Sequence, residues 1–388
     1  MNDNTDIRQE VDKRFYNLLI GLSNAQDVAG VEIEGKVKAE QSEQLNARRS
    51  LLRVEKLAKR DMELNKRSEI NYIEGTRDSL NTIIFEKIEK QFLEPEVIQT
   101  KVLSMPHSIA ELLDSTSVKA ASIAKLEPII EQIPWLASDL LKLVNTPKYR
   151  KTDRLGKAIV VENLRMALSF IGMENLKMVI PSMTFKRAIP QITDPYPAFK
   201  NKVWEHALGS ALSSQRIATL YKVNPNHAFV LGMFHELGKL AVTRLYFRVF
   251  DEVHLEAQVE AHDKQERELH AALMKIQPTA NTLLTLMWQH SVPQSSNIID
   301  YLGMQRVFIA NAMQEYASKP PIDNMSPLCK TLFHANGYSK FSMLKRYKLI
   351  NNEEAKSFIK SLQMPAATFR ALQATDIRRL NVAVEEEA

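Results

Sequence analysis

Apolar residues recur at helical spacing along most of this chain of 388 residues. The clearest example spans residues 199–221, where Trp204 and Leu208 fall on one face of a helix. Asn224-Pro225 follows, and this pair is typical of a helix start, because asparagine caps free N–H groups and proline suits the first turn. No strand pattern stands out in the last three quarters of the chain. The pattern therefore predicts an all-α protein.

The same spacing predicts a series of further helices, separated by proline, glycine or polar residues. Pro128 falls inside one of them, which is read either as two short helices or as one kinked helix. Residues 31–37 alternate weakly between apolar and polar and predict one short strand. The further helices are expected at residues 6–22, 120–133, 136–144, 155–171, 174–185, 225–238, 240–260, 264–276, 280–290, 295–317, 326–335, 352–362 and 365–372.

The segment before Pro95, the first proline, differs in composition from the rest of the chain. Residues 39–92 are rich in Glu, Lys, Arg and Leu, and pairs such as Leu57 and Leu64 lie seven apart, although no register persists. This segment predicts either a coiled coil that joins copies of the chain into a homo-oligomer or a solvated helix that packs on the rest. We therefore expect three parts, which are a helical N-terminal extension at 1–95, a central domain at 96–335 and a C-terminal helical segment at 336–388.

Composition narrows the classes of partner and location. Hydrophobic residues make up 45% of the chain, enough for a sizeable core, and the formal net charge is +5. The two signs are interspersed rather than gathered into a basic stripe, so nucleic acid is not the expected partner. Cys329 is the single cysteine, and no uncharged apolar stretch approaches the length of a membrane span. These features predict a cytoplasmic protein without an internal disulfide.

Candidate chemistry lies at the junction of two predicted helices. A short turn should make these helices antiparallel neighbours, so that His206 and His235 face each other. His235 and Glu236 would diverge by about 100° on a regular helix, and both can reach one ion only where the helix ends, which Gly238 is expected to provide. Imidazole and carboxylate groups hold divalent metals in hydrolytic sites. Lys239 is a candidate contact for a phosphate group.

Taken together, these residues resemble the H…HD-x-G-K pattern of the HD superfamily of metal-dependent phosphohydrolases. Within that superfamily, the chain looks most similar to the HDOD family, the HD-related output domains of bacterial signalling proteins. The resemblance covers about residues 100–315 and implies a multi-helix bundle with a role in signal transduction. Five further segments carry it, and they are Leu103-Ser104-Met105-Pro106, Ile133 to Asn145, Ala158 to Gly172, Trp204-Glu205-His206-Ala207 and Trp288 to Pro293.

Departures from the pattern of the active relatives concern their acidic residues. Glu236 stands where these enzymes have aspartate, and it would shift a metal because it is one methylene longer. Ala310-Asn311 is the best match to the Ala-Asp pair that supplies their distal acid, so an amide replaces that carboxylate. Gln277 and Tyr301 stand near the positions where the HD-GYP relatives carry extra histidines.

The resemblance and its departures together predict a remnant metal site, made of His206, His235, Glu236 and Asn311, which would hold at most a single divalent ion. We therefore expect a non-catalytic regulatory module that binds a protein partner or a small effector such as a nucleotide. Two alternatives stay open. The first is a divergent metal-dependent phosphohydrolase acting on nucleotides or phosphoesters, and the second is a helical scaffold that oligomerises through residues 39–92.

Overall fold

The computed structural model describes residues 3–31, 53–118, 121–150 and 159–380, and every regular element within these ranges is helical. The predicted all-α fold is confirmed. None of the described helices carries an apolar stretch long enough to cross a bilayer. The strand expected at 31–37 and the first part of the segment 39–92 fall almost entirely outside the described residues.

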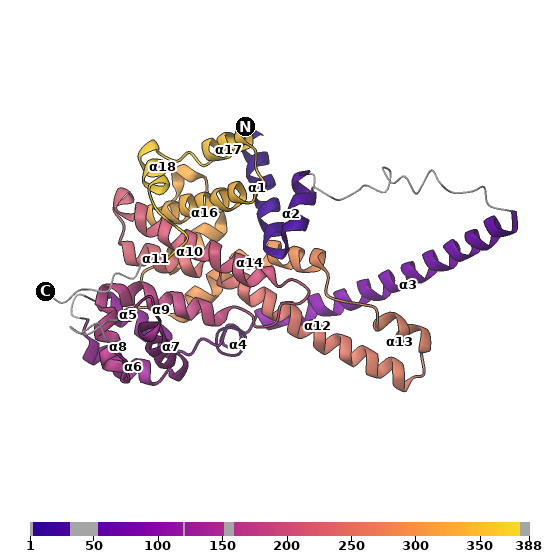
Figure 1. The fold of residues 1–388 in the computed structure, drawn as a ribbon, viewed down its shortest axis with the longest axis horizontal. Coiled ribbons are helices and arrows are strands. Elements are labelled where there is room, and N and C mark those ends of the chain that lie inside the picture. The colour runs from indigo at the N-terminus through magenta and orange to yellow at the C-terminus, as the bar shows by residue number, and fades with distance from the viewer. Residues whose placement is uncertain (1–2, 32–52, 119–120, 151–158, 381–388) are drawn as a thin grey trace.

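The N-terminal region contains one long helix that leaves the body of the molecule (Figure 1). Residues 62–72 of this helix, α3, are all exposed, whereas Leu80, Ile84 and Ile88 near its end are buried. The buried end packs on α12, where Lys87 pairs with two glutamates. The described elements of this region are α1 (Asp3–Ile20), α2 (Leu22–Ala29), α3 (Arg53–Phe92), α4 (Pro95–Val97) and the π-helical turn η3 (Ile98–Val102).

Five helices gather at one end of the body, at the lower left of Figure 1. Pro128 lies inside a single helix here, so the alternative of two short helices is wrong. Asn145 ties this group together, because its amide accepts from the backbone N–H of Val161 and donates to the Val161 carbonyl. The five helices are α5 (Ser108–Ser117), α6 (Ile123–Glu131), α7 (Pro134–Asn145), α8 (Leu164–Ile171) and α9 (Met173–Ala188).

The centre of the molecule is built around α10, which packs on α11 on one side and on α16 on the other. Gly232 permits the close approach of α11, because a Cβ there would lie 2.7 Å from the Cα of Ala211. The remaining elements are α10 (Ala198–Ala218), η4 (Thr219–Tyr221), α11 (Pro225–Phe234), α12 (Leu237–Asp263), α13 (Arg267–Leu273), α14 (Ala280–Leu302), α15 (Ala310–Ser318), η5 (Ile322–Asn324), α16 (Pro327–Arg346), α17 (Asn352–Ser361) and α18 (Ala366–Gln373).

The predicted helices at 280–290 and 295–317 have wrong boundaries, because α14 ends at Leu302 and α15 begins only at Ala310. The sequence pattern placed a turn between helices 280–290 and 295–317, but α14 runs without a break through Pro293. Proline cannot donate to the carbonyl four residues earlier, which belongs to Gln289. Gln289 is exposed, so water can satisfy that carbonyl and the helix continues.

The contact between α12 and α14 is close enough to exclude a methyl group at Gly238. A Cβ at this position would lie 1.8 Å from the carbonyl oxygen of Ser291 and 2.6 Å from the backbone nitrogen of Ser295. The helices would have to separate. Gly75 provides a matched control, because it lies on the exposed part of α3 with open space around it.

We expect the substitution Gly238→Ala to destabilise the protein by about 3 kcal/mol, the upper end of the usual cost of overpacking. Gly75→Ala should instead stabilise α3 by up to about 1 kcal/mol, since alanine favours helix. Thermal unfolding of both variants followed by circular dichroism measures the difference. A Gly238→Ala variant that unfolds at the wild-type temperature would contradict this account of the α12–α14 contact.

Candidate metal centre

Two antiparallel helices bring the predicted histidines together. His206 lies midway along α10, and His235 is the C-cap residue directly after α11. The Asn224 side chain caps the start of α11 as predicted, accepting from the backbone N–H groups of Asn226 and His227. The rings of His206 and His235 lie 5.6 Å apart between centroids and are buried. The expectation that they face each other is confirmed.

The break between helices comes earlier than the sequence pattern indicated. We expected Gly238 to end the helix, but α11 ends at Phe234 and Gly238 lies inside the first turn of α12. The Ser295 hydroxyl braces the corner, donating to the His235 carbonyl at 2.6 Å and accepting from the Gly238 N–H at 2.8 Å. The break is what lets two adjacent side chains, His235 and Glu236, turn toward one point.

The side chains of the cluster converge on the carboxylate of Glu236. Its Oε1 lies 3.1 Å from Nε2 of His235 and 3.7 Å from Nε2 of His206. Nζ of Lys239 lies closer still, at 2.6 Å from the same oxygen. One ligand atom from each histidine and from Glu236 lies within 4.8 Å of the others. All four side chains are buried.

Hydrogen bonds fix the orientation of both imidazoles. Nδ1 of His235 lies 2.8 Å from the Gly232 carbonyl, which can only accept, so Nδ1 carries the proton. Nδ1 of His206 lies 3.0 Å from the Ser339 hydroxyl, which donates its own proton to the His206 carbonyl. Each ring in its neutral form therefore directs the lone pair of Nε2 toward Glu236. Partners of this kind commonly orient metal-binding histidines.

The charges in the cluster are set by burial and by each other. Burial lowers the pKa of His206 well below its usual value and leaves the ring neutral near pH 7. Burial alone would raise the pKa of Glu236, but the Lys239 ammonium opposes it, both histidines add to that effect when protonated, and the pKa is held well below its usual range. Burial lowers the pKa of Lys239, and the Glu236 carboxylate opposes that shift. Glu236 and Lys239 form a buried ion pair.

The donor set fits a single divalent ion in part. Three atoms of the cluster are buried without a hydrogen-bond partner among the described residues, and they are Nε2 of His206, Nε2 of His235 and Oε2 of Glu236. Two imidazoles and one carboxylate are a known ligand combination for such ions. The charge balance fits less well. Lys239 already neutralises Glu236, so a divalent ion would add two positive charges beside the Lys239 ammonium. The cluster contains no further carboxylate to balance them.

The N-terminal helix α1 covers the cluster, a contact that the sequence pattern did not predict. The ring of Phe15 lies 4.3 Å from that of His206 between centroids. Nζ of Lys239 lies 4.8 Å from the centre of the Tyr16 ring. Asp12 of the same helix pairs with partly buried Lys340 of α16 at 2.6 Å. Amphipathic spacing predicted that α1 has a buried face, but local spacing cannot identify the partner of that face.

The fourth predicted ligand is not with the other three. Asn311 is exposed near the start of α15, whereas His206, His235 and Glu236 are buried. A second Ala-Asn pair, Ala335-Asn336, lies on α16 and is buried, with Oδ1 of Asn336 lacking a partner and its amide donating to the Tyr316 hydroxyl. The sequence offered both pairs, and only burial separates them.

Replacing Glu236 with glutamine should leave the Lys239 ammonium buried without a counter-charge and cost about 3–5 kcal/mol of stability. Lys239→Met should cost a similar amount by stranding the carboxylate. The double variant should lose much less than the sum, since neutral groups replace the whole pair. Denaturant unfolding at pH 7 measures all three variants. Additive losses would mean that the two groups do not form the buried pair.

The chain matches a known domain family and is similar to a solved structure. The HDOD domain model matches residues 102–296, half of the chain. A solved structure described as a "Putative metal-dependent phosphohydrolase" from Shewanella amazonensis SB2B is 14% identical, covers 74% of this chain and 99% of its own, and has a TM-score of 0.38, too low to carry an argument. No curated protein matches the chain. The matched range contains His206, His235 and Glu236, and the chain belongs to the HDOD domain family.

Proposed function

We propose that this protein is a non-catalytic regulatory module of signal transduction, which acts by binding a protein partner or a small effector. The observation that carries the proposal is the ion pair between Glu236 and Lys239. A hydrolytic metal site needs its carboxylate to hold an ion and an open position for water. Here the Lys239 ammonium of the chain itself forms an ion pair with the Glu236 carboxylate, in the place that a metal ion would occupy.

The covering helix supports the same proposal. Phe15 and Tyr16 lie against His206 and Lys239, and these aromatic rings leave the cluster without exposure to solvent. A phosphoester could reach the histidines only if α1 moved away. Lys239, predicted as a phosphate contact, is itself buried under the same rings. We therefore assign the cluster a structural role, in which it holds α10, α12 and α1 together.

Metal content and turnover test this proposal. Full-length protein purified without chelators should contain far less than one equivalent of iron or manganese. It should not hydrolyse bis-p-nitrophenyl phosphate above the background rate when Mn²⁺ is supplied. His235→Ala should lower the unfolding temperature, because it removes a buried ring, whereas His262→Ala at an exposed position should not.

Stoichiometric iron or manganese, together with hydrolysis that His235→Ala abolishes, would overturn the non-catalytic proposal. That result would favour the alternative of a divergent metal-dependent phosphohydrolase. One observation favours this alternative, which is that Nε2 of His206 and Nε2 of His235 both lie near the Glu236 carboxylate.

We infer a second role, oligomerisation, from the outer part of α3. Residues 62–72 are exposed on every side, and Met62, Leu64, Ile70 and Tyr72 are among the exposed large hydrophobic residues. Helices gain most of their stability from packing, so a partner for this segment is expected. A second copy of the chain is the partner that the spacing of leucines in residues 39–92 favours.

Light scattering on the full-length chain should give the mass of a dimer or a larger oligomer. The double substitution Met62→Glu and Ile70→Glu should lower the mass to that of a monomer, because it places charges on one stripe of the helix. A monomeric wild-type protein at micromolar concentration would remove the support for this role. Glu63→Gln, at an equally exposed position, serves as the control.

A further inference from the structure

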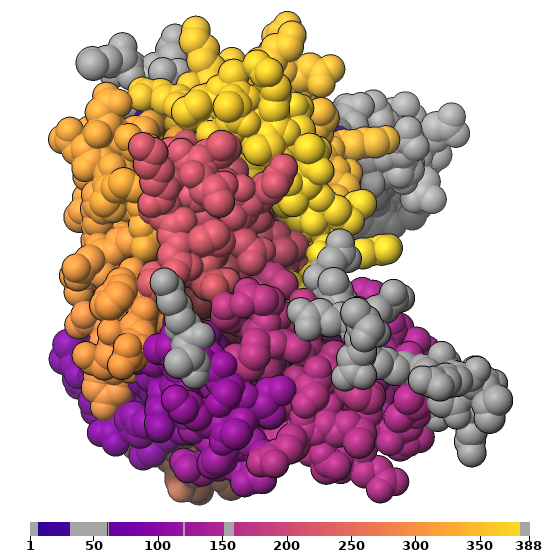
Figure 2. Space-filling view, turned by 90° about the vertical axis from the view of Figure 1, so that its left-hand side faces the viewer, coloured from indigo at the N-terminus to yellow at the C-terminus, as the bar shows by residue number. Residues whose placement is uncertain are grey.

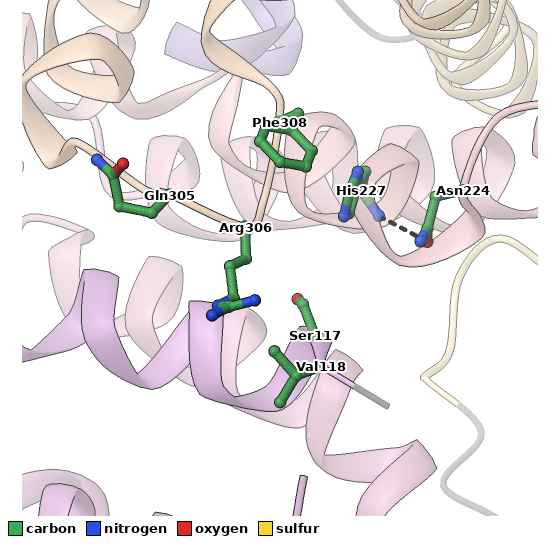
Figure 3. Close-up of a pocket in the computed structure, with 7 residues that line it drawn as sticks. All are labelled: Ser117, Val118, Asn224, His227, Gln305, Arg306 and Phe308. Carbon is green, nitrogen blue, oxygen red and sulfur yellow. Dashed lines mark hydrogen bonds between the residues drawn. The ribbon is translucent and has the colours of Figure 1, made fainter. Parts of the chain in front are cut away.

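A pocket of about 610 Å³ lies at the junction of three parts of the chain, away from the histidine cluster (Figure 3). These parts are the end of α5, the start of α11 and the connection between α14 and α15. On the face drawn in Figure 2, the purple, rose and orange parts of the chain that contain them meet. The pocket is lined by Ser117, Val118, Asn224, His227, Gln305, Arg306 and Phe308.

One wall of the pocket is held rigidly by a carboxylate. Asp114 accepts from three successive backbone N–H groups, at 2.6 Å from Gln305, 2.7 Å from Arg306 and 3.0 Å from Val307. These bonds fix the connection between α14 and α15 and also satisfy the charge of Asp114. The wall is therefore ordered before any ligand arrives, which lowers the entropic cost of binding.

Arg306 supplies the positive charge of the pocket. Its backbone is fixed by Asp114, while its side chain extends toward Ser117 and Val118 (Figure 3). Within the part of the chain that the structure describes, no hydrogen bond or ion pair engages its guanidinium group. A guanidinium group offers five N–H donors in a planar fork that matches phosphate oxygens. The side chain is thus available to an anion.

Phe308 supplies a flat apolar surface beside this charge. Its side chain is 70% exposed, so a face of the ring is open to a ligand. Its ring lies 5.8 Å from the ring of His227 between centroids, at 72°, so the two rings form a corner. A planar ring in a ligand can stack on Phe308 and meet the edge of His227.

The remaining polar groups of the pocket indicate what the central part of a ligand could contact. The N–H groups of Asn226 and His227 are already taken by the Asn224 side chain, so the start of α11 does not supply the anion site. The Ser117 hydroxyl donates to the Leu113 carbonyl and keeps its own lone pairs for a donor in the ligand. Burial lowers the pKa of His227, which leaves Arg306 as the cation of the pocket.

We propose that this pocket binds a nucleoside monophosphate, with the phosphate on Arg306, a sugar hydroxyl on Ser117 and the base on Phe308. The volume lies within the range of small-molecule sites. Glu111 and Asp114 line the adjoining hollow and offset the charges of Lys125 and Arg306 there, so the hollow offers no net positive charge to additional phosphate groups. The proposal extends the proposed regulatory role by naming a class of effector. It does not depend on whether Glu236 binds a metal ion or pairs with Lys239.

Isothermal titration calorimetry on the full-length chain tests the proposal with AMP and GMP, with adenosine and guanosine, and with inorganic phosphate. A monophosphate should bind at least tenfold more tightly than its nucleoside and than inorganic phosphate. Arg306→Gln should weaken the monophosphate at least tenfold and bring its affinity to that of the nucleoside. Phe308→Ala should weaken both the monophosphate and the nucleoside, but not inorganic phosphate.

Arg370→Gln provides the matched control, because Arg370 is an exposed arginine on α18, which contributes no residue to the pocket, and this variant should bind like wild type. The proposal is overturned if neither monophosphate binds at millimolar concentration, or if Arg306→Gln binds as wild type does. Equal binding of inorganic phosphate and the monophosphates would overturn the role of Phe308. Loss of binding in a Phe308→Ala variant that melts well below wild type does not count as support, and the Arg306→Gln result then decides.

Discussion

The buried charge of Glu236 is the constraint on which the centre of this molecule depends. A carboxylate without solvent is costly, so positive groups must surround it. Lys239 lies three residues further along the chain, and the first turn of α12 places its ammonium 2.6 Å from that carboxylate. The same turn must include Gly238, because α14 passes too closely for any side chain. One ionised group thus dictates where a helix begins and how its neighbour packs.

The HDOD match covers the histidines and Glu236 but not everything that surrounds them. Phe15, Tyr16 and Asp12 come from α1, and Ser339 and Lys340 come from α16, which all lie outside residues 102–296. These outer helices orient the His206 imidazole, cover it with the Phe15 ring and add a second, partly buried ammonium. The family motif therefore sits in surroundings that the flanking sequence provides. In a chain of this family, the motif alone does not define the chemistry.

Much of the fold followed from the sequence because its signals are local. The cap at Asn224 and the pairing of His206 with His235 depend on residues close together in the chain, and both were predicted. The run of α14 through Pro293 was missed, because its tolerance depends on water reaching an exposed carbonyl. The contact of Phe15 with His206 joins residues far apart in the chain, and helical spacing gives a buried face but not its partner. Asn336 was not singled out beside Asn311 for the same reason, since burial, which distinguishes the two, is a tertiary property.

Lys239 has a consequence for how the protein behaves in a cell. A metal ion taken up from solution to balance the charge of Glu236 would bind or dissociate as its concentration changed, and a chelator could remove it. An ammonium group that is part of the same helix stays beside the carboxylate at a constant effective concentration. If the cluster holds no metal, as we propose, the folded state does not depend on metal homeostasis. A regulatory module of the kind proposed would then respond to its effector in the same manner under metal starvation and metal excess.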